Sequence, residues 1–364
     1  MIDNNTGQEK SPLIKILFVA RTYPPLVGGM ERFASDFYHH MQELSQVRLI
    51  ANPIGKKNII PFFFKVMVYL IIHSRDYDII HFNDAILAPL LLIIRIFSNT
   101  KVTFTVHGLD VVYQKYGYQR LVIPFLRRAD KIFPVSQYTK NQCLQRHVPE
   151  KNLQIIPNGL DFAQDTHCTE ENKASVLSKI PQDLTDKTIL FTIGRLIARK
   201  GHVWFIENVF PLLPSHYVYL IAGNGPEYSI INQVIRKSGL ENRIILMGYV
   251  PEGEKRCLFQ LADVFIMPNI SDQHDQEGFG IVLLEAGKNA LPVVASDIEG
   301  IKDAVIDNVS GLLVREKDAR AFYNAILHID IDRNQIFDQL RQKYDWQVTR
   351  QMYLDEFREL LPNI

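Results

Sequence analysis

The sequence predicts an α/β protein with two parallel sheets, each covered by helices. Short apolar runs alternate with helical stretches along the chain, which is typical of strands buried between two layers of helices. The alternation stops in a polar stretch at residues 164–187 and then begins again with a new apolar run. The length of 364 residues also suits two domains of the usual size, roughly 100–200 residues each.

The first half of the chain begins with a strand, a turn and a helix. Residues 14–20 form an apolar run, a turn rich in proline and glycine follows, and residues 30–44 have helical periodicity. This order predicts a Rossmann-like domain over residues 1–163. Its further strands are expected at residues 47–51, 78–82, 101–106, 131–135 and 153–156.

The second half repeats this pattern. Residues 188–194 have the composition of a buried strand that ends in glycine, after a linker near residues 160–187. This predicts a second Rossmann-like domain over residues 164–345. The last helical stretch, residues 346–364, follows the second set of strands, and we expect it to pack back on the first domain. Later strands of the second domain are expected at residues 217–222, 243–246, 264–267, 292–295 and 311–314.

Composition narrows the class of protein. Hydrophobic residues make up 47% of the chain and charged residues 22%, which is ordinary for a folded domain and argues against disorder. Cys143, Cys168 and Cys257 lack metal-ligand spacing, so we expect free thiols in a reducing cytoplasm. Residues 1–12 are polar and lack the basic-then-apolar order of a secretory signal, and we expect a frayed tail.

Charge is divided unevenly, although the formal net charge is zero. Residues 1–160 carry 19 Lys and Arg against 11 Asp and Glu, and residues 161–364 carry 21 against 29. An anionic membrane or a nucleic acid would suit the basic half, and a lopsided solvated surface is the alternative. The chain has no recognised nucleic-acid-reading motif, so we expect no nucleic-acid partner.

Two apolar runs in the first half are candidates for contact with lipid. Residues 59–72 and 85–97 are both shorter than the roughly 20 residues of a membrane span. Buried or amphipathic helices of an α/β domain are one interpretation, and a face that also touches membrane is the other. With nearby basic residues they predict a peripheral location on the inner face of the cytoplasmic membrane. These basic residues are Arg120, Arg127, Arg128 and Lys131.

Two glutamates flank the start of an expected helix in the second half. Glu277 precedes a glycine-containing turn at residues 278–280, and Glu285 follows eight positions after Glu277, just over two helical turns. Glu285 lies in an apolar run, where an unpaired charge is costly, so ligand hydroxyls are good partners for it. The glycines let backbone N–H groups approach an anion such as a diphosphate. For either glutamate alone, a helix cap or a core ion pair is the alternative.

In their order along the chain, the motifs resemble the retaining glycosyltransferases of family 4. Glu277 and Glu285 match that family's glutamate-x7-glutamate signature, and the resemblance runs from about residue 14 to residue 346. It implies the GT-B fold, in which two Rossmann-like domains face each other across a cleft. The other matching segments are residues 24–29, 107–110, 157–161, 194–196, 200–201, 223–227 and 263–268.

The resemblance implies transfer of a hexose-type sugar, with retention of configuration, from a nucleotide diphosphate sugar to an acceptor hydroxyl. The donor would bind mainly to the second domain and the acceptor to the first. Glu285 would hold the ribose hydroxyls, and Glu277 the transferred sugar. The implied catalytic residues are Arg195, Lys200, Glu277 and His107. The implied donor-binding residues are Gly28, Gly29, Gly194, Gly223, Gly225, Gly278, Phe279, Gly280, Ile281 and Glu285.

The types of the implied catalytic residues suit these tasks. Arg195 and Lys200 follow an expected strand, where a guanidinium and an ammonium meet the charge that develops on a diphosphate leaving group. His107 follows another strand, at the end where α/β sheets build ligand sites, and by resemblance approaches the donor sugar. Taken singly, the two cations would be surface charges and the histidine a structural residue.

A glycine pair and an aspartate pair in the first half of the chain argue against a bound cofactor or metal. Gly28 and Gly29 lack the G-x-G-x-x-G spacing, and no acidic residue follows at the right place, which argues against a nicotinamide dehydrogenase. Asp76 and Asp78 have the spacing of a metal-holding pair, but they precede a buried strand. We therefore expect no metal and no cofactor.

One segment departs from the family's pattern. Residues 297–303 are Asp-Ile-Glu-Gly-Ile-Lys-Asp, where the family usually has two adjacent glycines followed by isoleucine, proline and an acidic residue. Glu299 replaces the first glycine, and a glutamate does not allow the same close backbone approach. The adjacent subsite is expected to be reshaped, with Arg195 and Lys200 retained.

Cell-envelope glycan synthesis, of lipopolysaccharide, capsule or exopolysaccharide, is the expected setting by analogy, with a glycan or lipid-linked acceptor. Two other functions fit the same fold: a nucleotide-sugar epimerase, and a non-catalytic donor-binding scaffold subunit. The nucleotide, the sugar, the acceptor and the linkage depend on the shape of the pocket, which motifs do not determine.

Overall fold

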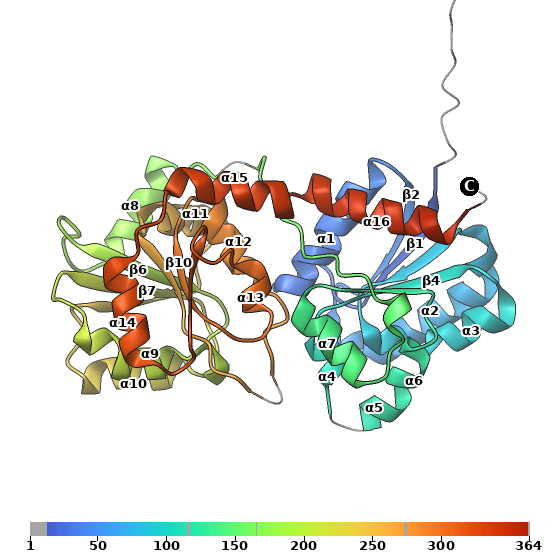
Figure 1. The fold of residues 1–364 in the computed structure, drawn as a ribbon, viewed down its shortest axis with the longest axis horizontal. Helices are drawn as coiled ribbons and strands as arrows, with labels where there is room; N and C mark the ends of the chain where they lie inside the picture. The colour runs from blue at the N-terminus through green and yellow to red at the C-terminus, as the bar shows by residue number, and fades with distance from the viewer. Residues whose placement is uncertain (1–12, 115–116, 165, 273–274, 363–364) are drawn as a thin grey trace, which may run out of the picture. The chain divides into compact units, whose positions relative to one another are not determined.

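The computed structural model describes residues 13–114, 117–164, 166–272 and 275–362. The N-terminal stretch expected to be a frayed tail therefore lies outside the described residues. The chain splits into two compact units, each with one parallel sheet (Figure 1). Unit 1 contains Met1–Val135, Lys140–Ile156 and Thr349–Ile364, and unit 2 contains Ser136–Thr139 and Pro157–Val348. Residues 157–163, assigned from the sequence to the first domain, thus group with unit 2.

The sheet of unit 1 has five parallel strands in the order β2-β1-β3-β4-β5. This is a doubly wound order, in which the chain changes direction across the sheet between β1 and β3. The strands are β1 (Lys15–Ala20), β2 (Gln46–Ala51), β3 (Ile79–Phe82), β4 (Lys101–Val106) and β5 (Lys131–Pro134). The helices between them are α1 (Gly29–Gln42), α2 (Ile59–His73), α3 (Leu90–Phe97), α4 (Leu109–Val112), α5 (Tyr118–Leu121) and α6 (Ile123–Leu126), and α7 (Gln137–Gln145) follows β5.

Both faces of this sheet are buried, because successive side chains of a strand point to opposite sides. Leu17 and Val19 of β1 join the apolar cluster that includes the buried residues of α2 and α3. Phe18 points to the other face, where its ring centroid lies 4.5 Å from that of Phe37 in α1. A sheet buried on both faces explains why its strands are continuous apolar runs in the sequence.

The C-terminal helix α16 (Trp346–Leu360) covers the same face of the first sheet as α1 from Thr349 onward. The Tyr353 hydroxyl lies 2.7 Å from Thr105 Oγ1 in β4, and its ring packs edge-on against Phe37. Lys131 Nζ at the start of β5 lies 2.7 Å from Glu356 Oε2. The helix therefore supplies part of the hydrophobic core of unit 1.

The sheet of unit 2 has six parallel strands in the order β11-β10-β9-β6-β7-β8. This is the strand order of the Rossmann fold, and the chain changes direction across the sheet between β6 and β9. The strands are β6 (Thr188–Ile193), β7 (Tyr217–Ala222), β8 (Ile244–Gly248), β9 (Val264–Met267), β10 (Val293–Ser296) and β11 (Gly311–Val314). The helices are α8 (Glu170–Ser178), α9 (His202–Asn208), α10 (Tyr228–Lys237), α11 (Glu252–Leu261), α12 (Ile281–Lys288), α13 (Ile301–Ala304), α14 (Ala319–His328) and α15 (Arg333–Tyr344).

The segment expected to be a strand at residues 153–156 does not form one in the structure. Leu153 forms only an isolated bridge with Ile132 of β5, and the N–H of Ile156 donates to the carbonyl of Pro134. This segment runs beside β5, the outermost strand of the first sheet, without forming a continuous ladder.

The expectation of free thiols is wrong for two of the three cysteines. Cys168 and Cys257 form a disulfide in unit 2, whereas Cys143 is free and buried. Cys257 lies on α11 and Cys168 just before α8, two helices that pack against each other. The cysteines are 89 positions apart, so only the packing of α8 on α11 brings them together.

Candidate functional site

The predicted site residues lie near the carboxyl ends of the two sheets. In doubly wound sheets, ligands bind outside those ends, where the strand order reverses. In unit 2 the reversal lies between β6 and β9, and Lys200 and Glu277 follow those two strands. In unit 1 it lies between β1 and β3, with Asn83 directly after β3 and His107 directly after β4.

A buried ion-pair cluster occupies the carboxyl end of the second sheet. Glu277 Oε2 lies 2.5 Å from Lys200 Nζ and 2.6 Å from Arg199 Nη1, and the three side chains are only 13–14% exposed. Asn269 Nδ2 donates to the same oxygen at 3.3 Å, and Arg199 Nε lies 3.0 Å from Asp275 Oδ1. All the contacts of Glu277 with these side chains are therefore made by Oε2.

The two cations determine the charge of Glu277. Burial alone would raise the pKa of Glu277, but Lys200 and Arg199 hold it at about 2. Burial lowers the pKa of Lys200, and the charge of Glu277 opposes that change. Glu277 is thus a fixed anion and a weak proton acceptor at neutral pH. The core ion pair considered from the sequence is present, and it lies where the fold builds ligand sites.

Arg195 lies apart from this cluster. It follows β6 directly, is exposed, and forms no ion pair with any residue that the structure describes. Arg199, which no sequence motif identified, lies beside Glu277 instead. The adjacent cations Arg199 and Lys200, just before the left-handed Gly201, are the sequence signal that could have identified it.

Three glycines of the predicted site bring two loops of unit 2 together. Gly223 has a φ of +123°, and a Cβ there would lie 1.9 Å from the carbonyl oxygen of Gly194. A Cβ at Gly225 would lie 2.1 Å from the carbonyl oxygen of Leu196. Any side chain at these positions would push the loop after β7 away from the loop after β6. These glycines therefore determine where the backbone next to Arg195 lies.

The turn before α12 separates the two glutamates. Gly280 has a φ of +85°, which favours glycine, and Ile281 begins the helix just after it. The Phe279 side chain is buried, and its ring packs edge-on against Tyr344. Gly278 is the residue between Glu277 and this buried anchor. The predicted donor-binding residues of this turn thus combine a buried core anchor, Phe279, with the backbone N–H groups at the start of α12.

Glu285 has a different partner from Glu277. Its Oε1 lies 3.0 Å from Lys255 Nζ of α11, and Lys255 also lies 2.9 Å from Glu252. The Glu285 side chain is mostly buried, whereas that of Glu252 is exposed. No sequence motif identified Lys255, another charged residue of this region.

His107 is held by polar groups at the carboxyl end of the first sheet. Its Nε2 lies 3.0 Å from Asn83 Oδ1, and its backbone N–H donates to Asp110 Oδ1 at 2.8 Å. Burial lowers the pKa of His107 to about 4, so the ring is neutral at pH 7 and Nε2–H is the donor to Asn83. Asn83 is 1% exposed, and its Nδ2 has no hydrogen-bond partner among the described residues.

Arg21 and Asp84 form a second polar pair beside His107. Arg21 Nε lies 2.5 Å from Asp84 Oδ2, and Asp84 is buried. Burial, followed by the charge of Asp84, raises the pKa of the buried Asp110 to about 7. No sequence motif identified Arg21, Asn83 or Asp84. Their position directly after β1 and β3 was the available signal.

Gly28 and Gly29 lie exposed at the start of α1, after the loop that follows β1. A Cβ at Gly28 would meet only the movable carboxylate of Glu31, at 2.4 Å. Packing therefore does not require glycine at position 28, in contrast to Gly223 and Gly225.

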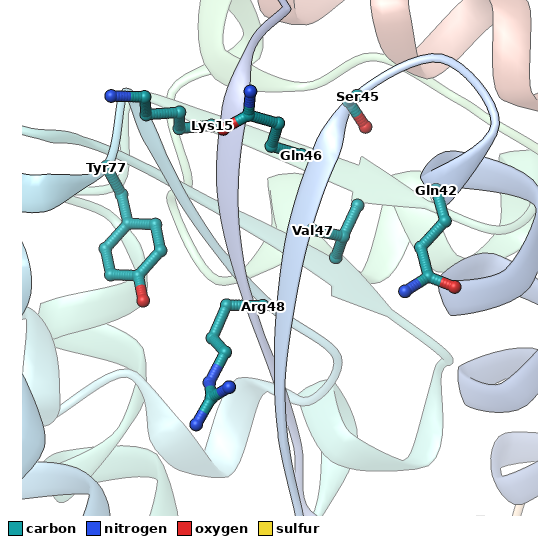
Figure 2. Close-up of a pocket in the computed structure, with 7 residues that line it drawn as sticks. All are labelled: Lys15, Gln42, Ser45, Gln46, Val47, Arg48 and Tyr77. Carbon is teal, nitrogen blue, oxygen red and sulfur yellow. The ribbon is translucent and has the colours of Figure 1, made fainter.

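A shallow pocket lies away from all of these residues. It has a volume of about 500 Å³ and is lined by the first residues of β1 and β2, Lys15 and Gln46, together with Arg48 and Tyr77 (Figure 2). These residues belong to the amino end of the first sheet, whereas His107 and Asn83 follow its carboxyl end. The pocket therefore does not coincide with the predicted site.

Comparison with protein families gives a match for each half of the chain. The family described as "Glycosyltransferase Family 4" matches residues 27–164, and "Glycosyl transferases group 1" matches residues 187–330. A GDP-mannose-dependent alpha-(1-6)-phosphatidylinositol monomannoside mannosyltransferase of Mycobacterium tuberculosis is 27% identical over 72% of this chain and 69% of its own. A UDP-Gal:alpha-D-GlcNAc-diphosphoundecaprenol alpha-1,3-galactosyltransferase of Escherichia coli is 25% identical over 74% of this chain and 70% of its own.

Solved structures agree on the fold. Anabaena HepE in complex with UDP and glucose has a TM-score of 0.76 at 19% identity, covering 95% of this chain and 100% of its own. Sucrose-phosphate synthase of Thermosynechococcus elongatus also has a TM-score of 0.76, at 18% identity, covering 96% of this chain and 100% of its own. The predictions of two Rossmann-like domains and of the family are confirmed. The chain belongs to the family 4-like glycosyltransferases with the GT-B fold.

Proposed function

We propose that this glycosyltransferase moves a hexose from a nucleotide diphosphate sugar to an acceptor hydroxyl, with retention of configuration, in cell-envelope glycan synthesis. The observation that carries the proposal is the buried Lys200–Glu277–Arg199 cluster at the point where the strand order of unit 2 reverses. The mannosyltransferase and galactosyltransferase relatives support the envelope setting, because their names specify a phosphatidylinositol monomannoside and a diphosphoundecaprenol acceptor. Unit 2 would bind the donor and unit 1 the acceptor.

The proposed step breaks the bond between the sugar C1 and the diphosphate oxygen, and the electron pair stays on that oxygen. The acceptor oxygen bonds to C1 from the same face, and its proton passes to the departing phosphate. Lys200 and Arg195, with the N-terminus of α12 after Gly280, would stabilise the negative charge that develops. Because the contacts of Glu277 with Arg199, Lys200 and Asn269 all use Oε2, Oε1 would accept a sugar hydroxyl.

The protonation states of the site support proton transfer to the leaving group. Glu277 has a pKa of about 2, so it is a weak general base, and its ion pairs restrain it from attacking C1. His107 has a pKa of about 4, and its Nε2–H donates to Asn83. The departing phosphate is therefore the proton acceptor in this proposal, and no covalent sugar–enzyme intermediate forms.

Donor binding can be measured without knowledge of the acceptor. A ligand that binds only the folded state raises its stability by about 2.7 kcal/mol at 100 times Kd. In a thermal-shift panel of UDP-, GDP-, ADP- and dTDP-sugars, we expect at least one donor to raise the Tm. The same donor should give little shift with Lys200→Ala. A panel in which no donor raises the Tm of the natural chain would contradict the proposal.

Removal of divalent metal is expected to leave the transfer rate unchanged. Among the described residues, no group of three or more His, Cys, Asp and Glu side chains is arranged to hold a metal ion. Asp76 is paired with His73, and Asp78 accepts the backbone N–H of Lys15. Initial rates with and without excess EDTA are the measurement. Complete loss of activity that added Mg²⁺ or Mn²⁺ restores would contradict metal-independent transfer.

We also propose that unit 1 docks on an anionic membrane through α2 and α3, which pack against each other. None of the described helices is long and apolar enough to cross a membrane. Every fourth residue of α2 is nevertheless apolar and 52–67% exposed, and α3 exposes two apolar residues with the same spacing. The exposed residues with this spacing are Ile60, Phe64, Val68 and Ile72 of α2 and Leu92 and Ile96 of α3.

Basic side chains accompany this apolar face. Lys65 of α2 and Arg75 after it are exposed. Each Lys or Arg near an anionic surface contributes about 1 kcal/mol of attraction, which salt screens. Arg95 pairs with Asp130 and Lys131 pairs with Glu356, so we do not include either residue in the docking surface.

Sedimentation with liposomes that contain anionic lipid tests the docking surface. We expect binding at low salt that weakens at high salt, and at least tenfold weaker binding for the double variant Phe64→Ser/Ile96→Ser. Leu212→Ser, which removes an exposed apolar side chain of unit 2, is the control and should bind as the natural chain does. Equal binding by all three proteins, or no binding at either salt concentration, would contradict docking through α2 and α3.

A further inference from the structure

Glu299 lies in contact with the main chain of Glu277. Its Oε2 accepts the backbone N–H of Glu277 at 2.5 Å. The next residue, Gly300, donates its own N–H to the carbonyl oxygen of Glu277 at 3.0 Å. The turn after β10 therefore holds both polar groups of the Glu277 main chain.

The turn at Glu299 and Gly300 also packs closely against the backbone that follows Glu277. A Cβ at Gly300 would lie 2.0 Å from the carbonyl oxygen of Gly278, so only glycine allows this approach. Glu299 has a φ of +48°, a left-handed conformation that residues other than glycine adopt infrequently. A glutamate thus occupies a position where the backbone favours glycine, and its carboxylate accepts a hydrogen bond from the Glu277 N–H.

Two separate hydrogen bonds connect the turn to Glu277. Gly300 already connects the two segments through its own hydrogen bond. The bond from Glu299 adds a constraint on the Glu277 peptide, next to the carboxylate that Lys200 and Arg199 hold. A catalytic group is effective when its backbone as well as its side chain is held in the productive geometry.

We propose that Glu299 is a positioning residue, whose carboxylate holds the main-chain amide of Glu277 and so directs Glu277 Oε1 toward the transferred sugar. The proposal rests on the proposed function for its effect on catalysis, but the contact itself is independent of activity. It also gives Glu299 a role of its own at the position where the family usually has glycine.

The strength of the contact depends on the protonation of Glu299. Burial raises the pKa of Glu299 to about 7, and the bond from the Glu277 amide and the charge of Arg199 oppose this. The carboxylates of Glu277 and Glu316 raise it further. Because an ionised carboxylate is the stronger acceptor, we expect the hold on Glu277 to weaken as pH falls through about 7.

The contact is tested by following the Glu277 amide in TROSY spectra of the perdeuterated full-length chain between pH 5 and pH 9. We expect its proton resonance to titrate with a midpoint near 7 and to move downfield as the pH rises. In Glu299→Gln this titration should be absent. A resonance that does not titrate, or that titrates equally in Glu299→Gln, would overturn the proposal.

The role is tested by steady-state kinetics of Glu299→Gly and Glu299→Gln. We expect Glu299→Gly to lower kcat about tenfold, with little change in the donor KM and no loss of Tm, because glycine relieves the left-handed backbone. Glu299→Gln keeps an acceptor oxygen at the same reach but, like protonated Glu299, carries no charge. Its kcat at pH 8 should therefore lie between those of Glu299→Gly and the natural chain, and it should not fall further below pH 7.

Glu316→Gln is the matched control. Glu316 lies near Glu299, but it accepts hydrogen bonds from Ser271 and makes none to Glu277. Its kcat at pH 8 should match that of the natural chain, and the fall in kcat should move to lower pH, because the Glu316 carboxylate raises the pKa of Glu299. Full kcat in Glu299→Gly would overturn the positioning role. Absence of turnover by the natural chain with every donor would instead contradict the proposed function, and the amide titration would then decide the proposal for Glu299.

Discussion

Replacement of Lys200 by alanine is expected to lower kcat/KM for donor by about 10²–10³-fold, the loss seen when one preorganised donor to a developing anion is removed. In this chain the loss has two sources. The ammonium that would meet the diphosphate is absent, and Glu277 keeps Arg199 as its one remaining cationic partner in the cluster. The measurement is nucleotide release under donor-limited conditions, with Tm recorded for each variant.

Two further variants make the Lys200 result interpretable. Lys200→Arg keeps the positive charge beside Glu277 and should retain a folded chain with intermediate activity, because a guanidinium differs in shape from an ammonium. Lys237→Ala removes an exposed lysine at the end of α10 and should have no effect. Activity of Lys200→Ala equal to that of Lys237→Ala would remove Lys200 from the site.

Replacement of Glu285 by glutamine is expected to lower kcat/KM by about 100-fold, mainly through a higher donor KM. A carboxylate accepts hydrogen bonds from two ribose hydroxyls, whereas an amide turns one acceptor into a donor and leaves a hydroxyl unpaired. The substitution also removes the partner of Lys255, whose Nζ lies 3.0 Å from Glu285 Oε1. Donor KM and kcat, measured at saturating acceptor, separate a binding defect from a defect in the chemical step.

The same lysine provides the control for Glu285. Glu252 lies 2.9 Å from Lys255 but is exposed, so Glu252→Gln perturbs Lys255 without changing the buried carboxylate. Its kinetics should match those of the natural chain. If Glu252→Gln raised the donor KM as much as Glu285→Gln, the effect would arise from Lys255 and not from contact of Glu285 with the ribose.

Most of the fold could be predicted because the strands of both sheets are buried on both faces. Such strands are continuous apolar runs, and the expected strands at residues 101–106, 217–222, 264–267 and 311–314 match β4, β7, β9 and β11 at both ends. The run at residues 153–156 is also apolar, but it lies beside the outermost strand and forms only an isolated bridge. The local sequence pattern does not distinguish a strand of the sheet from an apolar segment that runs beside its edge.

The candidate site could be predicted in part, because its residues follow strands. The position of Lys200 and Glu277 follows from the loops that carry them, but the partner of Glu277 is Arg199, whereas the motif drew attention to Arg195. Whether Arg195 or Arg199 contacts Glu277 depends on how the loops after β6 and β9 pack against each other. The Cys168–Cys257 disulfide and the contact of Glu299 with Glu277 likewise result from packing between distant segments, which spacing along the chain does not encode.

Retaining transfer to an acceptor hydroxyl can be tested directly by incubating the chain with a donor labelled at the sugar C1 and a panel of hydroxyl acceptors, followed by NMR of the product. We expect nucleoside diphosphate to be released in equal amount to the sugar transferred, and the new bond to have the same anomeric configuration as the donor. An isomerised donor formed without acceptor would indicate an epimerase. Donor binding without nucleotide release would indicate a scaffold, and an inverted product would contradict retention.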